Sequence, residues 1–251
     1  MEWLAAIIGL FAGGVLNVIA DRVPPLDPEW DGPFVAGRPR KLDWWEWLPV
    51  ASWLSASRAP RMKIRNSPLR YPVLEIAVAS AATLAWARFG DSAAIAVAVA
   101  VFAAILVTLG AIDFETKYLP FKVVIPLAVA GLAFAPFWPD MQPWHPFAGA
   151  ALGFAIFFPI YWLGEKLGRP LMGGGDAYLA AAMGAILGIQ MLLLGLYIGV
   201  IVGGIAGIAV YLARAFGVRQ RVIAYGPYLS LGGLVALYYG RTIVDWLTSQ
   251  V

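Results

Sequence analysis

The chain has 251 residues, of which 61% are hydrophobic and 13% charged, with a formal net charge of +3 at pH 7. An ordinary soluble domain is about half apolar and about a quarter charged, so lipid must be the solvent for most of this chain. Cysteine is absent and there is one histidine, which excludes disulfides, cysteine-based zinc ribbons, Cys-His nucleophilic pairs and two-histidine metalloproteases.

Apolar runs recur along the chain with lengths close to the ~20 residues that cross a bilayer. They predict an all-α polytopic membrane protein with about eight transmembrane helices. The first run lacks a basic leading segment and a small-residue cleavage site, which favours a retained helix over a signal peptide. The boundary between the sixth and seventh runs is expected around residues 188–191. The predicted spans cover residues 2–20, 71–88, 93–112, 121–138, 147–164, 176–190, 192–213 and 228–246.

Lysine and arginine set the predicted orientation, because cytoplasmic loops near helix ends hold an excess of them. Placing residues 21–70 inside leaves only Arg88 and Arg241 of the eighteen basic residues outside. Residues 21–70 are then a small cytoplasmic domain between the first two helices. Its four tryptophans are interpreted as membrane-interface residues rather than as nucleobase-stacking ones, so no nucleic acid partner is expected.

Three acidic residues fall within or at the ends of predicted spans: Glu75, Asp113 and Asp176. A carboxylate at membrane depth is expensive and usually marks a functional site, although a solvated helix end is the plainer alternative for the two aspartates. Both aspartates lie at predicted cytoplasmic boundaries, so their carboxyls are expected to meet at one depth. Glu75 is expected either to pair with a nearby cation or to contact substrate.

Three glycines, Gly173, Gly174 and Gly175, precede Asp176. Taken alone they suggest a flexible connection, but beside an acidic residue they indicate close backbone approach and a negative charge at a helix N-terminus. Two carboxylates near one water share a proton, since both cannot ionise at such a short distance. The pair then provides general acid and base without metal, thiol or imidazole, which is aspartyl peptidase chemistry.

A series of motifs occurs along almost the whole chain. In order, they are Gly13-Gly14-Val15-Leu16-Asn17-Val18 with Arg22-Val23-Pro24, Trp47-Leu48-Pro49-Val50-Ala51-Ser52-Trp53-Leu54, Arg70-Tyr71-Pro72-Val73-Leu74-Glu75, Asp113 with Leu119-Pro120, Gly173-Gly174-Gly175-Asp176, and Gly226-Pro227-Tyr228-Leu229-Ser230-Leu231-Gly232. Together they resemble the type IV prepilin leader peptidase family.

The resemblance implies that Asp113 and Asp176 are the catalytic pair, with Gly173 to Gly175, Glu75 and Pro120 shaping the backbone or the substrate site. It implies a peptidase membrane domain over residues 71–251. The expected substrates are type IV prepilins and type II secretion pseudopilins, cut at the cytoplasmic face of the bacterial inner membrane. Many members also N-methylate the new terminus with S-adenosylmethionine, so a bifunctional enzyme is expected.

The cytoplasmic loop departs from the family pattern. Many members carry two Cys-x-x-Cys pairs there, whereas this chain has Val35 to Arg38 and about Pro60 to Lys63. Zinc is therefore not expected, and residues 21–70 are assigned to a methyltransferase-associated region without a glycine-rich cofactor fingerprint. The oligomeric state and the particular pilin stay open.

The sequence is also compatible with two other classes of membrane protein. A secondary transporter would use Asp113 and Asp176 as proton or cation sites, and it shares intramembrane carboxylates and glycine-broken helices with the peptidase. Its coupling residues would be expected near the bilayer midplane, whereas these aspartates are predicted at one face. A membrane scaffold would leave the ordered motifs unexplained.

Overall fold

The computed structural model describes residues 1–23, 34–35, 38–39, 48–49, 70–139, 141–168, 172–214 and 224–249. These residues belong to two compact units, Met1–Thr116 and Lys117–Val251. Most of the predicted cytoplasmic domain at residues 21–70, including its tryptophan cluster, lies outside the described residues. In the described part of that segment, β1 (Phe34–Val35) and β2 (Arg38–Pro39) form a short antiparallel pair.

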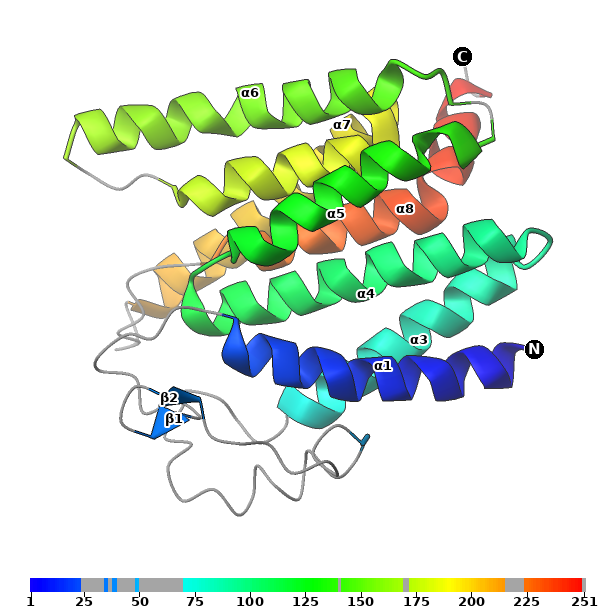
Figure 1. Cartoon of the computed structure of the whole chain (residues 1–251). Coiled ribbons are helices and arrows are strands. Elements are labelled where there is room, and N and C mark those ends of the chain that lie inside the picture. Colours follow the sequence, from blue (N-terminus) through cyan, green and yellow to red (C-terminus); the bar gives the residue numbers. More distant parts are fainter. Residues whose placement is uncertain are drawn as a thin grey trace. The chain divides into compact units, whose positions relative to one another are not determined.

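The first unit is built from three helices that pack side by side (Figure 1). They are α1 (Glu2–Arg22), α3 (Arg70–Phe89) and α4 (Ala93–Thr116). Leu74 and Val78 of α3 and Ala104 of α4 are buried together, and Ala12 and Leu16 of α1 pack against them. Each helix therefore turns one apolar stripe toward the other two.

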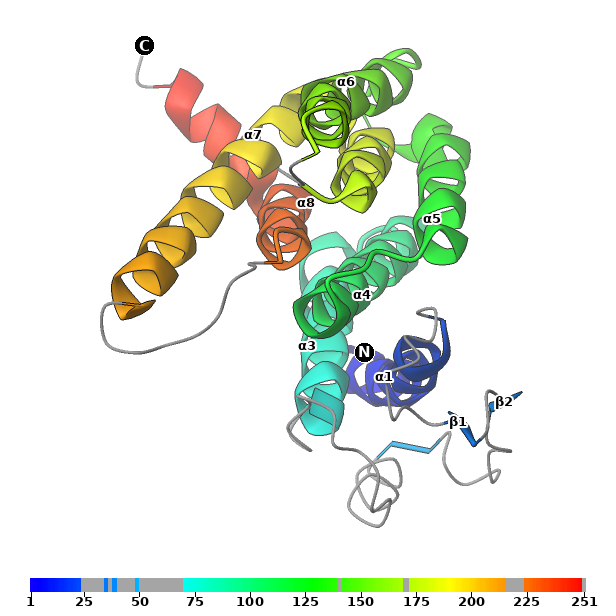
Figure 2. The same ribbon diagram turned by 90° about the vertical axis from the view of Figure 1, so that its left-hand side faces the viewer.

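The second unit contains α5 (Phe121–Phe134), η2 (Ala135–Phe137), α6 (His145–Lys166), α7 (Gly174–Arg214) and α8 (Gly226–Thr248). Helices α5, α6 and α8 all pack against α7 (Figure 2). The contact between α6 and α7 is close enough that a Cβ at position 184 would lie 2.1 Å from the carbonyl oxygen of Gly149. Backbone thus touches backbone at this crossing, which only glycine permits.

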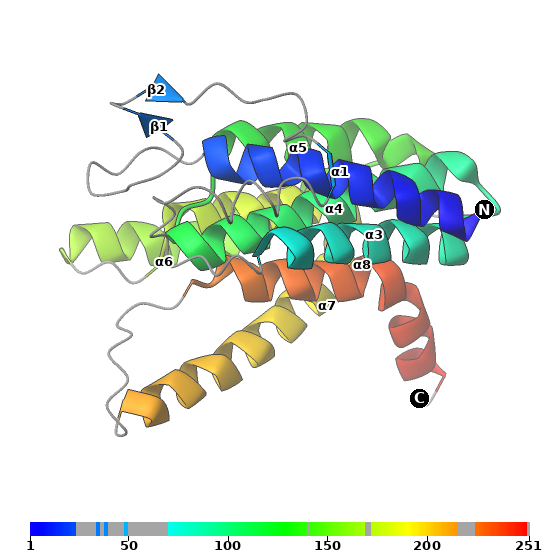
Figure 3. The same ribbon diagram turned by 90° about the horizontal axis from the view of Figure 1, so that it is seen from below.

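Gly188 interrupts α7 with φ 70° and ψ 176°, a conformation that glycine adopts readily and other residues avoid. Two helical segments result, and the later one leaves at an angle to the first (Figure 3). The break falls at the boundary predicted between the sixth and seventh apolar runs. The predicted fourth run also ends early, because regular α-helix stops at Phe134 and a 3₁₀ turn follows.

Within the described residues, five helices are long and apolar enough to cross a membrane: α1, α3, α4, α6 and α7. A shorter apolar helix covers Phe121–Phe137. Large apolar side chains such as Val73, Val129 and Ile205 are exposed on helix surfaces, where lipid would cover them. The fold is thus that of a helical, polytopic membrane protein, and the count of eight spans stays a prediction.

Candidate active site

Asp113 lies in the last turn of α4 and is 5% exposed. Ala104 and Ala111 of the same helix pack toward α1 and α3. At about 100° per residue, Asp113 is rotated about 180° from Ala104. Its carboxyl therefore belongs to the face of α4 that turns away from α1 and α3, which it shares with buried Leu106 and Leu109.

The segment after α4 turns sharply into α5. Lys117 has φ 57°, in the left-handed region that ends helices and that few residues other than glycine adopt. Leu119 and Pro120 are buried. The carbonyl of Pro120 accepts hydrogen bonds from the N–H groups of Val123 and Val124, at 2.9 and 3.1 Å. Pro120 therefore caps the start of α5 with its backbone.

Asp176 lies in the first turn of α7 and is 6% exposed. Its backbone N–H donates to the carbonyl of Gly173 at 3.1 Å, and the helix N-terminus favours its negative charge. A Cβ at position 175 would lie 2.7 Å from Cβ of Leu119, and one at position 174 would lie 3.2 Å from the ring of Tyr161. The glycines before Asp176 thus allow neighbouring segments to approach the start of α7 closely.

Tyr225, immediately before α8, is a residue near Asp176 that the sequence did not single out. Burial raises the pKa of the Tyr225 hydroxyl, and the negative charge of Asp176 raises that pKa further. The tyrosine ring lies 6.3 Å from the ring of Phe157 and 6.5 Å from that of Tyr228, centroid to centroid. No spacing pattern points to this pairing, because 49 residues separate Tyr225 from Asp176 in the sequence.

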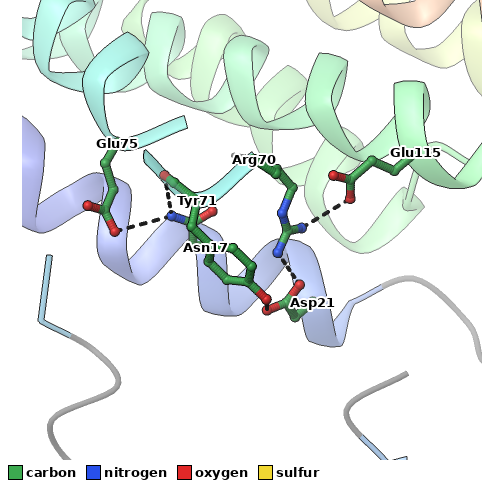
Figure 4. A network of polar contacts seen from close by, with 6 residues as sticks. All are labelled: Asn17, Asp21, Arg70, Tyr71, Glu75 and Glu115. Atoms are coloured by element: carbon green, nitrogen blue, oxygen red, sulfur yellow. Dashed lines mark hydrogen bonds and ion pairs between the residues drawn. The ribbon is translucent and has the colours of Figure 1, made fainter. Parts of the chain in front are cut away.

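A polar network joins the ends of α1, α3 and α4 (Figure 4). Arg70 donates from Nη1 to Oε2 of Glu115 at 3.2 Å and from Nη2 to the carboxylate of Asp21. The Tyr71 hydroxyl donates to Oδ2 of Asp21 at 2.8 Å, and the Arg70 guanidinium lies 4.5 Å from the centroid of the Tyr71 ring. Sequence reasoning noted Arg70 and Tyr71 in a motif but missed both carboxylates.

Glu75 is fully buried between α1 and α3. Asn17 of α1 donates from Nδ2 to Oε1 of Glu75 at 3.3 Å and to the backbone carbonyl of Tyr71 at 3.1 Å (Figure 4). A Cβ at Gly13 would lie 2.6 Å from Cα of Glu75. The structure therefore places Glu75 at a close helix crossing, on α3 rather than on the helices that carry the aspartates.

In the described part of the chain, no group of three or more His, Cys, Asp or Glu side chains is arranged to hold a metal ion. Residues 21–70, to which the methyl-transfer step is assigned, lie mostly outside that part.

Comparison with known proteins identifies the class of this membrane protein. Residues 100–208 match the model of the type IV leader peptidase family, and residues 7–89 match that of the bacterial peptidase A24 N-terminal domain. The two matches together include Asp113, Asp176 and all of α3.

Relatives named prepilin leader peptidase/N-methyltransferase match over nearly the whole chain. One from Xanthomonas campestris pv. campestris is 29% identical, covering 96% of this chain and 92% of the relative. One from Aeromonas hydrophila is 30% identical and covers 97% of this chain and 92% of the relative. One from Pseudomonas putida is also 30% identical and covers 96% of this chain and 91% of the relative. The chain therefore belongs to the type IV leader peptidase family. No solved structure matches it.

Proposed function

We propose that this protein is an aspartyl endopeptidase of the membrane that removes the N-terminal leader from type IV prepilins or type II secretion pseudopilins. It also N-methylates the new N-terminus. The observation that carries the proposal is the near full-length similarity to prepilin leader peptidase/N-methyltransferases. The transporter interpretation gains no support from this similarity.

Asp113 and Asp176 form the catalytic pair. Both carboxyls are nearly fully buried at helix ends, where solvation by bulk water does not explain them. Leu119 follows Asp113 by six residues and packs against Gly175, the neighbour of Asp176. The motifs that hold the two aspartates resemble those of the family's catalytic pair, and this resemblance supports their assignment.

Hydrolysis follows from one proton shared by the pair. The ionised carboxylate takes a proton from water while the protonated one donates to the oxygen of the scissile carbonyl. Water oxygen adds to the carbonyl carbon to give a gem-diol. When the C–N bond breaks, the proton taken from water passes to the leaving nitrogen, and one diol hydroxyl returns its proton to the carboxylate that had donated. The pair ends with one proton, as it began.

The remaining predicted site residues shape the surroundings of the pair. Gly173, Gly174 and Gly175 leave room beside Asp176 for an extended substrate segment, which must unwind because helical hydrogen bonds shield its peptide groups. Pro120 fixes the turn into α5. Glu75 either contacts the substrate or, through Asn17, holds α1 against α3.

The methyl donor is S-adenosylmethionine, and we assign the methyl-transfer step to residues 21–70. This donor supplies the methyl group for the new N-terminus. The assignment rests on the names of the relatives and on the resemblance of the motifs.

We place the protein in the bacterial cytoplasmic membrane with eight spans and both termini outside. The 21–70 segment and the aspartates then lie at the cytoplasmic face. The distribution of lysine and arginine supports that orientation.

The experiment is cleavage of a co-reconstituted prepilin, with and without S-adenosylmethionine, read by intact mass. Wild type, Asp113→Asn, Asp176→Asn and the control Asp91→Asn are compared; Asp91 lies exposed in the turn between α3 and α4. We expect leader loss in wild type and control only, and a further methyl group when the donor is present. Cleavage by either active-site variant would refute the pair, and no cleavage of several prepilins would direct attention to ion-flux assays.

A further inference from the structure

Arg70 stands between two carboxylates that come from different helices (Figure 4). The side chains are largely buried: Arg70 is 7% exposed, Asp21 of α1 15% and Glu115 of α4 11%. An arginine fork binds carboxylates in fixed directions, and burial protects such pairs from screening by salt. The two ion pairs therefore fix the orientation of the Asp21 and Glu115 carboxylates as well as their distance from Arg70.

Glu115 follows Asp113 by two residues on α4. Two residues turn an α-helix by about 200°, so the two carboxyls lie on nearly opposite faces. Glu115 continues the stripe of Ala104 and Ala111 that packs toward α1 and α3. Holding Glu115 against Arg70 therefore fixes the rotation of the last turn of α4, and with it the direction of the Asp113 carboxyl.

Such a contact has most effect at a helix end, where Glu115 lies. The last carbonyl groups of a helix have no partner within the helix, and helix ends open more readily than helix centres. Here the helix stops at Thr116, and Lys117 adopts a left-handed conformation. Thr116 does contribute one local contact, because its hydroxyl donates to the carbonyl of Ile112 at 2.8 Å.

We propose that Arg70 is a positioning residue for Asp113 and acts through Glu115. This inference rests on the proposed function, since it requires Asp113 to take part in cleavage. The role of Arg70 is to position another residue and not to react. It holds one side of α4 so that the carboxyl on the other side keeps its direction.

The two carboxylate partners of Arg70 have different tasks. Glu115 is the partner on α4, whereas Asp21 joins α3 to α1 and also accepts the Tyr71 hydroxyl. Loss of the Asp21 charge removes more contacts than loss of the Glu115 charge. A positioning role thus predicts that the two variants rank differently in the two measurements. Glu115→Gln should lower kcat more than Asp21→Asn does, and Asp21→Asn should lower the unfolding temperature more than Glu115→Gln does.

The test measures kcat, KM and the unfolding midpoint of reconstituted protein cleaving a prepilin. Glu115→Gln keeps the side-chain shape, and we expect kcat to fall about tenfold or more with KM within about twofold, since small misplacements of reacting groups slow reactions strongly. Arg70→Lys should keep part of the rate that Arg70→Met loses. The double variant Arg70→Met/Glu115→Gln should be no slower than Arg70→Met alone, because the two residues act as one unit.

Amide hydrogen exchange supplies a readout that does not depend on peptidase activity. Glu115→Gln should speed exchange across residues 110–116 and leave residues 75–85 unchanged. The matched control is Arg88→Met, since Arg88 lies exposed in the last turn of α3, and this variant should change neither rate nor exchange.

A folded Glu115→Gln protein with wild-type kcat and wild-type amide exchange would overturn the inference. So would a loss of kcat in Glu115→Gln that is no larger than the loss in Asp21→Asn. Failure of the proposed function is recognised separately. In that case wild type leaves the prepilin intact, or Asp113→Asn still cleaves it.

Discussion

Both units bring helices together at close glycine crossings, and the first unit adds directed polar bonds. At the end of α1, α3 and α4, buried charges and amides form directed hydrogen bonds around Arg70 and Asn17. Between α6, α7 and α8, backbone approaches backbone, as at Gly149 with Gly184. Lipid offers no hydrophobic drive between helices, so small residues and polar bonds must supply the attraction. Close packing sets how near two helices lie, whereas a directed polar bond also sets their rotation.

The largest expected effect comes from filling the close crossing of α6 and α7. In Gly184→Val, the new side chain would meet the backbone of Gly149, which cannot move aside as a flexible side chain would. We expect a loss of more than about 4 kcal/mol of stability and little folded protein. Yield of monodisperse protein in detergent and the unfolding midpoint measure this loss.

Gly204→Val is the matched control on the later part of α7. A Cβ there meets nothing within 4 Å, so this variant should express and unfold like wild type. If both glycine variants behaved alike, close packing would not be what holds α6 against α7.

Removing the charge of Arg70 is expected to have the next largest effect. Arg70→Met leaves the carboxylates of Asp21 and Glu115 without the cation that both contact. Breaking a buried ion pair by removing one partner destabilises by roughly 3–5 kcal/mol. Denaturant unfolding should show the loss.

Arg70→Lys sharpens this measurement. Lysine keeps the charge but lacks the fork that reaches two carboxylates at once, so its stability should lie between those of Arg70→Met and wild type. Equal stability of the lysine variant and wild type would mean that charge alone, without direction, secures the network.

A smaller effect is expected in α8. Oγ of Ser230 is buried and finds no hydrogen-bond partner among the described residues. A buried polar group without a partner destabilises by about 1–3 kcal/mol. Ser230→Ala should therefore be neutral or raise the unfolding midpoint, and a clear drop would reveal a partner for the hydroxyl.

The smallest effect concerns alkaline pH. The folded state raises the pKa of Tyr225 through burial and the charge of Asp176, so the neutral hydroxyl is favoured more in the folded than in the unfolded chain. Its contribution to stability is full below the unfolded pKa of about 10 and is lost as the pH rises through the folded value. Tyr225→Phe should flatten the fall in stability above about pH 10, measured by unfolding at several pH values. An unchanged slope would show that the folded state does not raise the pKa of Tyr225.

Helix positions were largely predictable from the sequence because apolar runs of membrane length are a strong local signal. The run at residues 71–88 corresponds to Arg70–Phe89, and the run at 93–112 continues to Thr116. That extension brings Asp113, which the sequence put just past the predicted run, into the last turn of α4. The break at Gly188 was expected, although the apolar pattern alone did not reveal its left-handed backbone.

Partners across the bundle were not predictable. Arg70 lies 49 residues from Asp21 and 45 from Glu115 in sequence, and no periodic pattern links positions so far apart. For Glu75 the sequence allowed a cation or a substrate, whereas the structure adds an amide donor, Asn17. The catalytic roles of Asp113 and Asp176 stay predictions, supported by the family and by the burial of both side chains.

The contact between Leu119 and Gly175 has a consequence for how the sequence can drift. A Cβ at 175 would fall 2.7 Å from Cβ of Leu119, so position 175 accepts a side chain only if position 119 gives up volume or its backbone shifts. A smaller residue at 119 is compatible with Gly175, whereas a side chain at 175 calls for a change at 119. The turn after α4 and the start of α7 are thus coupled in the order in which their residues can change.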